Sequence, residues 1–81
     1  MLARNTTIRA EIAEIFRDVF EYQGPVAQDT SPENVERWDS LQHIALVRAI
    51  EEKFEITLSM DEMMEIDSAG AIANLLRRHS V

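Results

Sequence analysis

Residues 38–54 read WDSLQHIALVRAIEEKF. Apolar side chains recur along this stretch at the spacing of an α-helix. Asp39 is suited to cap that helix, and Gln42, three residues later, completes the pattern of a capping box. The stretch therefore predicts a helix from Ser40 to about Lys53, in which the hydroxyl of Ser40 lies in the first turn and is not needed for the cap.

This predicted helix carries two apolar faces. At about 100° per residue, one face gathers His43, Leu46, Val47, Ile50 and Phe54. The opposite face gathers Leu41, Ile44, Ala45 and Arg48. Because a small bundle buries one face of a helix, we assign the wider first face to the core. Leu41 and Ile44 are then exposed beside Ser40, and two apolar side chains surrounded by charge indicate a docking patch rather than isolated exposure.

A long helix is predicted near the start of the chain. Its apolar pattern runs from about Thr7 to Tyr22, with Thr6 or Thr7 as the cap. The Gly24-Pro25 pair ends it. Residues 23–38 then form a loop that is unusually long for so small a domain, and such loops often carry function.

Two further helices are predicted after residue 58. Residues 59–62 have the pattern of a capping box and predict a short helix through about Glu65. Asp67 or Ser68 caps a last helix that ends at about Arg78. Its apolar face comprises Ala69, Ile72, Ala73, Leu75 and Leu76. Since no segment alternates like a strand, we predict one all-α domain over residues 1–81, a four-helix bundle with three main helices, a short third helix and a long first loop.

Composition excludes several classes of protein. The chain has 81 residues, no cysteine and a formal net charge of −7. Residues 1–30, 31–67 and 68–81 carry net charges of −2, −7 and +2, which sum to −7, so the acidity belongs to the middle of the chain. Such a surface repels nucleic acid and anionic lipid. No apolar run is long enough to insert in a membrane and the N-terminus lacks a signal-peptide pattern, so we expect a cytoplasmic protein.

Ser40 is the candidate for covalent chemistry. A serine at a helix start is usually a cap, but Asp39 fills that role here. The free N–H groups and the positive dipole end of a helix N-terminus also favour a phosphate. A phosphodiester on Ser40 is therefore the alternative to a purely structural role.

Other chemistry-bearing residues have ordinary interpretations. We expect Trp38 to anchor the loop, His43 to be a satisfied, half-buried histidine, and His79 to be inert at a frayed end. Two distant histidines without a third ligand do not suggest zinc. Three methionines cluster in the short helix: Met60, Met63 and Met64. We prefer core packing for them over the alternative, an adaptable pocket for an acyl chain.

The chain resembles the acyl carrier proteins over essentially its whole length. The resemblance rests on Asp39-Ser40-Leu41 at a helix start, the long first helix and loop, the Glu51-Glu52-Lys53-Phe54 stretch, the short acidic helix and the last helix. It implies a 4'-phosphopantetheine arm joined to Ser40, with Asp39 as the flanking acidic residue. The thiol then belongs to the cofactor, which reconciles thioester chemistry with a chain that has no cysteine.

The resemblance also implies partners. These are a phosphopantetheinyl transferase, an acyl-loading ligase or acyltransferase, and downstream biosynthetic enzymes, all acting on a non-catalytic carrier. We assign partner binding to Leu41, Ile44, Arg48, Glu51 and Glu62. The chain is expected to be a monomer, and its initial methionine favours a free-standing protein.

The helix after Ser40 departs from the pattern of the fatty-acid-synthesis carriers. Gln42 and Ala45 occupy places on its exposed face that are typically acidic there, and Arg48 adds a positive charge. This favours a specialised biosynthetic pathway with its own enzymes over general fatty acid synthesis. The implied cargo is an acyl or aminoacyl group held as a thioester, and by analogy Leu41 after the serine favours an acyl over a peptidyl carrier.

Two other function classes remain open at this point. A small acidic helical module could dock through Leu41 and Ile44 without any cofactor. An enzyme is less favoured, because neither histidine has an evident serine or acid partner that would form a base–nucleophile pair.

Overall fold

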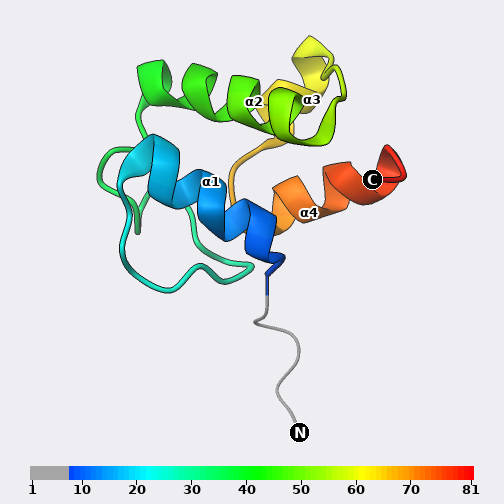
Figure 1. Cartoon of the computed structure of the whole chain (residues 1–81). Helices are drawn as coiled ribbons and strands as arrows, with labels where there is room; N and C mark the ends of the chain where they lie inside the picture. The colour runs from blue at the N-terminus through cyan, green and yellow to red at the C-terminus, as the bar shows by residue number, and fades with distance from the viewer. Residues whose placement is uncertain (1–7) are drawn as a thin grey trace, which may run out of the picture.

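The computed structural model describes residues 8–81 and contains four α-helices in that part of the chain. They are α1 (Ala10–Phe20), α2 (Ser40–Phe54), α3 (Met60–Glu65) and α4 (Ala69–Arg78). Figure 1 shows α1 crossing below α2, with α4 to one side and the short α3 near the end of α2. None of the described helices is both long and apolar enough to cross a membrane. The all-α prediction, with its short third helix and long first loop, is confirmed.

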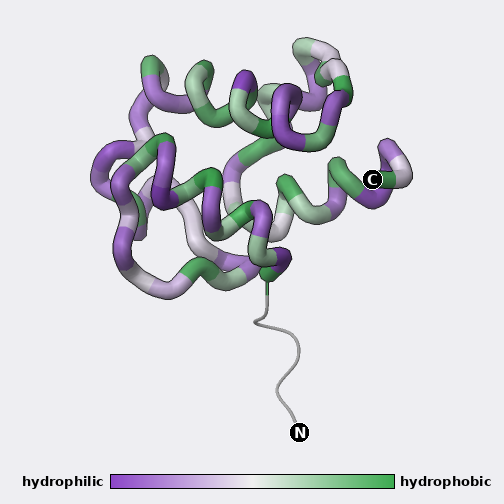
Figure 2. Tube along the Cα trace, viewed as in Figure 1, coloured by the Kyte–Doolittle hydropathy of each residue, from purple (hydrophilic) through white to green (hydrophobic). Residues whose placement is uncertain are grey.

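The core lies where α1, α2 and α4 meet. Figure 2 shows apolar positions recurring along each of these helices between hydrophilic ones, the amphipathic pattern of helices that bury one side. The helices contribute these residues to the core: Ile12, Ile15, Phe16, Phe20, Leu46, Val47, Ile50, Ala69, Ile72, Leu75 and Leu76. The connecting segments contribute Val35, Trp38, Leu58 and Ile66 to the core. The stripe of α2 that we assigned to the core is thus the buried one, with His43 and Phe54 half-buried at its ends.

The bounds of α1 differ from the prediction. Its N-cap is Arg9, whose side chain makes no capping hydrogen bond. The predicted caps Thr6 and Thr7 lie outside the described residues, but the helix starts three residues after Thr7, at Ala10. It ends at Phe20 because Glu21 adopts the left-handed conformation, with φ 54°, before the Gly24-Pro25 pair is reached. A left-handed residue closes a helix without requiring glycine or proline.

The other three helices begin at the capping residues that the sequence indicates. Asp39 accepts a hydrogen bond from the Gln42 N–H at 2.8 Å, although its own N–H donates to the Arg37 carbonyl and the reciprocal half of the box is not formed. Ser59 and Glu62 form both halves of a capping box. At α4 the cap is Ser68, which accepts from the Ala71 N–H.

The long loop is tied to the start of α4 by backbone hydrogen bonds. The N–H of Ala69 donates to the carbonyl of Thr30 at 2.9 Å, and the N–H of Gly70 donates to the carbonyl of Gln28 at 2.9 Å. The hydroxyl of the buried Thr30 accepts from the Ala27 N–H, which closes the turn that presents those carbonyls. These bonds satisfy helix N–H groups that have no partner within the helix.

Gly70 permits this close approach, and its replacement by alanine is expected to destabilise the protein. A Cβ at this position would lie 2.8 Å from the Gln28 carbonyl oxygen, which belongs to backbone and cannot swing away. Alanine normally stabilises a helix by about 1 kcal/mol relative to glycine. We expect the clash to outweigh that gain, so that Gly70→Ala lowers the free energy of unfolding by about 1–3 kcal/mol in urea denaturation.

A peptide of residues 67–81 supplies the matched control for this prediction. It lacks the Gln28 carbonyl, so the same substitution should raise its helicity in circular dichroism. A Gly70→Ala protein more stable than the wild type would contradict the prediction.

Candidate functional site

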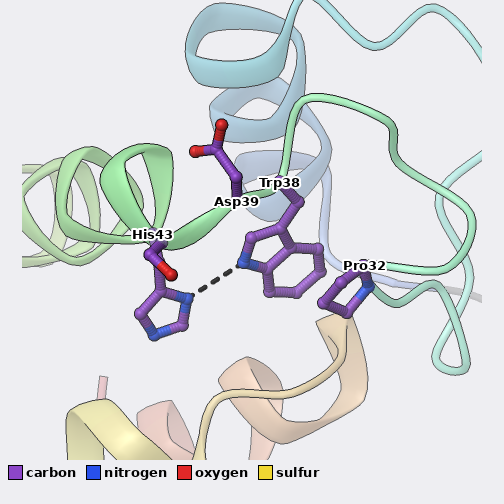
Figure 3. A pocket seen from close by; sticks show the side chains of 5 residues that line it. Pro32, Trp38, Asp39 and His43 are labelled. Atoms are coloured by element: carbon purple, nitrogen blue, oxygen red, sulfur yellow. Dashed lines mark hydrogen bonds between the residues drawn. The ribbon is translucent and has the colours of Figure 1, made fainter.

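Ser40 is the first residue of α2 and is exposed to solvent. Its hydroxyl makes no hydrogen bond to any of the described residues, because the carboxylate of Asp39 serves as the cap. A shallow, open depression adjoins it and is lined by Pro32, Trp38, Asp39, Ser40 and His43 (Figure 3). The prediction of a serine hydroxyl left free by its neighbour is borne out by this geometry.

The start of α2 is also electrostatically suited to an anion. The N–H groups of Ser40 and Leu41 have no backbone acceptor in the described part of the chain, as is usual at a helix N-terminus. The first turn of α2 carries no acidic side chain, and only the capping Asp39 precedes it. The positive end of the helix dipole therefore lies beside the Ser40 hydroxyl.

Trp38 anchors the loop directly before this serine, as predicted. Only 5% of its surface is exposed. Its ring packs edge-on against Phe16 at 5.4 Å and stacks with Phe20 at 5.3 Å between ring centroids. These contacts hold the residue before Asp39 against α1, and so place the start of α2 beside α1.

His43 joins this anchor to the third helix. The indole Nε1 of Trp38 donates to Nδ1 of His43 at 2.9 Å, drawn as the dashed line in Figure 3. The other ring nitrogen, Nε2, lies 3.0 Å from the carbonyl oxygen of Met63 in α3. Both nitrogens thus have partners, which agrees with the interpretation of His43 as a satisfied, half-buried histidine.

The outward face of α2 carries the predicted apolar patch. Leu41 is 76% exposed and Ile44 is 59% exposed, and both lie within a turn or so of Ser40. Below them a more enclosed and mostly apolar pocket of about 400 Å³ lies between α2 and α3. It is lined by His43, Ile44, Val47, Arg48, Glu51 and Met63. A mostly apolar pocket four residues along the helix from Ser40 is within reach of a group attached there.

The three charged residues that we assigned to partner binding differ in their surroundings. Arg48 is exposed and makes no ion pair with any described residue. The carboxylate of Glu51 accepts a hydrogen bond from the N–H of Leu58 at 2.9 Å. Glu51 therefore closes the connection between α2 and α3 as well as lining the pocket.

Glu62 is likewise held within the molecule. Its carboxylate accepts from the Ser59 N–H and lies 2.9 Å from Nε2 of His79. The hydrogen bond from the Ser59 backbone lowers the pKa of Glu62 below its ordinary value of 4.5, and the bond to His79 adds to this effect. The prediction that His79 is inert at a frayed end is therefore wrong, because it is half-buried and bonded to α3.

The methionine prediction is also wrong for two of its three residues. Met63 packs against the core, but Met60 and Met64 are 72% and 78% exposed. In a helix of six residues only one face meets the bundle, and that face belongs to Met63. Met60 and Met64, which we predicted to lie in the core, are therefore exposed apolar side chains on the surface of α3.

Comparison with known proteins agrees with this geometry. Residues 7–76 match the family model described as the phosphopantetheine attachment site. The match spans most of the chain, so the chain belongs to this family of carrier proteins. The holo acyl carrier protein of Geobacter metallireducens, solved by solution NMR, is similar to it with 28% identity and a TM-score of 0.75, over 83% of this chain and 78% of that chain. A comparison with proteins of curated function found none that matches significantly.

The family establishes the class of protein and its cofactor. Its members bear covalently attached phosphopantetheine and are non-catalytic carriers. The predicted resemblance to acyl carrier proteins, the carrier role and the phosphopantetheine cofactor are thereby confirmed. The alternative function, an interaction module without a cofactor, is therefore less favoured than a carrier.

The residues around Ser40 fit such a group. The phosphate of the arm needs a free hydroxyl for attachment and hydrogen-bond donors for its oxygens. The chain supplies the first-turn N–H groups of α2 and the Ser40 hydroxyl, which bonds no residue between 8 and 81. When bound, phosphopantetheine supplies the thiol that this cysteine-free chain lacks.

Proposed function

We propose that the chain holds acyl groups as thioesters on a phosphopantetheine arm attached to Ser40, and that Asp39 positions the site. The observation that carries this proposal is the division of roles at the start of α2. Asp39 caps the helix at 2.8 Å, which leaves the Ser40 hydroxyl exposed and without a hydrogen bond to the described residues. The family match supports the presence of a phosphopantetheine arm, and this geometry supports Ser40 as the residue to which the arm is attached.

The pocket between α2 and α3 favours an acyl cargo. Its walls are largely side-chain carbon from Ile44, Val47 and Met63. Burial of an alkyl chain there would be favoured by roughly 0.8 kcal/mol per methylene group. The sequence suggested core packing for all three methionines, with an adaptable acyl pocket as the alternative. For Met63, which lines this pocket, we now favour the alternative.

The enzymes that act on the carrier are proposed to dock on the outward face of α2. Leu41 and Ile44 supply apolar area beside Ser40. One turn further on, Arg48 supplies a positive charge that pairs with none of the described carboxylates. Glu51 would contribute through Oε1, because its Oε2 accepts from Leu58. Both oxygens of Glu62 are engaged, by Ser59 and His79, so Glu62 would contribute only its charge. A face with Gln42, Ala45 and Arg48 suits enzymes of a specialised pathway better than enzymes that select an acidic helix.

Transfer of phosphopantetheine from coenzyme A tests the attachment residue. The purified chain is incubated with coenzyme A and a broad-range phosphopantetheinyl transferase, and its intact mass is measured. The wild type should gain the mass of one phosphopantetheine, and Ser40→Ala should gain nothing. Ser80→Ala, which removes an exposed serine near the C-terminus, is the matched control and should be modified like the wild type. An unmodified wild type, or a mass gain that persists in Ser40→Ala, would contradict the proposal.

A further inference from the structure

The third helix is held in place with little help from burial. None of the residues of α3 is fully buried, whereas α1, α2 and α4 each contribute several side chains to the core. The buried anchors of this segment, Leu58 and Ile66, lie just outside the helix at either end. Its position between them therefore depends on the packing of one half-buried side chain, Met63, and on the bonds that other elements make to it.

The end of α4 and the helix α2 supply those bonds. Arg78, the last residue of α4, pairs with Glu65, and His79, which follows it, bonds Glu62. From α2, the only side-chain hydrogen bond to α3 among the described residues is that of His43 to the carbonyl of Met63. His43 is thus the hydrogen-bonded link between α3 and the helix that carries Ser40.

The partners of His43 determine which of its nitrogens carries the proton. The indole N–H of Trp38 can only donate, so Nδ1 of His43 must accept at 2.9 Å. Nε2 then carries the hydrogen in the neutral ring and donates to the Met63 carbonyl at 3.0 Å. The Trp38 bond and the near-parallel arrangement of the two rings, 12° apart, also fix the orientation of the imidazole.

The imidazole of His43 lies where its link to α3 can affect the functional site. His43 lines both the depression beside Ser40 and the pocket between α2 and α3. Met63, which accepts its hydrogen bond, lines the opposite wall of that pocket. We propose that His43 is a positioning residue whose Nε2–H donates to Met63, holds α3 against α2 and so keeps the pocket beside the attachment serine formed.

Two substitutions separate the two bonds of His43. His43→Gln places an amide nitrogen near the position of Nε2, so it keeps a donor for the Met63 carbonyl. His43→Asn is one bond shorter and places its amide near Nδ1, so it keeps an acceptor for Trp38 and loses the bond to α3. Both remove the imidazole and neither carries a charge, so a general effect of losing the ring would be the same in the two variants.

Amide hydrogen exchange on the unmodified full chain tests the link. In His43→Asn, the N–H groups of Met63 and Ile66 should exchange about tenfold faster, because one hydrogen bond to a half-buried carbonyl is lost. Those of Phe16 in α1 and Ile72 in α4 should change less than about twofold, and His43→Gln should leave α3 near the wild-type rate. Equal acceleration of α3 in both variants, or acceleration spread evenly over all helices, would overturn the proposal.

A measurement on the wild type stands independently of whether either variant folds. Long-range proton–nitrogen NMR spectra of the imidazole distinguish its two neutral forms. The proposal requires the hydrogen on Nε2 and a bare Nδ1 at a pH where the ring is neutral. A ring protonated on Nδ1 would have no hydrogen on Nε2 for the Met63 carbonyl, which would then keep only the N–H of Ile66 as its donor, and the proposal would be wrong.

The consequence for the cargo rests on the proposed function and is tested separately. With an octanoyl thioester on the arm, hydrolysis should be faster in His43→Asn than in His43→Gln, because the pocket loses one wall in the first variant only. Equal hydrolysis rates would overturn the claim that the link maintains the pocket. Failure of arm attachment would show in the mass spectrum of the wild type and would leave the exchange result on the unmodified chain unaffected.

Discussion

Replacing Trp38 by alanine is expected to lower the free energy of unfolding by about 3–5 kcal/mol. The ring is almost fully buried and contacts Phe16 and Phe20, so its removal leaves a cavity between the loop and α1. It also leaves Nδ1 of His43 without its donor. Because the whole stability of a domain of this size is about 5–15 kcal/mol, urea denaturation followed by circular dichroism should show a large shift in midpoint.

Trp38→Phe separates packing from hydrogen bonding in this prediction. Phenylalanine keeps an aromatic ring against α1 but has no N–H for His43, so we expect a loss of only about 1–2 kcal/mol. Equal losses in the two variants, or a loss below about 1 kcal/mol in Trp38→Ala, would show that the ring does not anchor the loop.

Leu41→Glu is expected to reduce kcat/KM for phosphopantetheine transfer to Ser40 by about 100-fold, while leaving the fold intact. The side chain is 76% exposed, so its replacement should change the free energy of unfolding by less than about 0.5 kcal/mol. In the complex, however, a carboxylate would have to be buried against the apolar surface that receives leucine. Initial rates at several carrier concentrations measure the effect.

Met60→Glu is the matched control for this substitution. It adds the same charge to a similarly exposed apolar residue, at the start of α3 and near the far end of α2 from Ser40 (Figure 1). We expect it to retain most of the wild-type kcat/KM. A comparable fall in both variants would indicate a general effect of added negative charge, and an unchanged Leu41→Glu would remove the patch from the proposed docking surface.

The starts of α2, α3 and α4 could be predicted from the sequence because their caps are local. Asp39, Ser59 and Ser68 each bond an N–H three residues later, an interaction that needs no other part of the chain. The start of α1 could not be predicted in this way, since Arg9 caps it without a side-chain bond. Instead, Cζ of Arg9 lies 5.1 Å from the centroid of the Phe54 ring, and its guanidinium donates to the Val81 carbonyl. Both contacts exist only in the folded chain.

The candidate site shows the same division. The free Ser40 hydroxyl and the exposed Leu41 follow from position on one helix, and both could be anticipated. The link from Trp38 through His43 to Met63 requires the loop, α2 and α3 to meet, so no spacing in the sequence indicates it. The same reason accounts for His79, whose partner Glu62 lies 17 residues away.

That α3 buries none of its own residues has a consequence for how such chains can diverge. Met60, Asp61 and Met64 have exposed side chains that make no bond to another described element, so substitutions there should leave the stability of the domain largely unchanged. Met63, by contrast, packs against the core and is the residue of α3 that lines the pocket beside α2. Selection can therefore change the outward surface of α3 in single steps, whereas a change in the pocket wall must also preserve the packing of Met63.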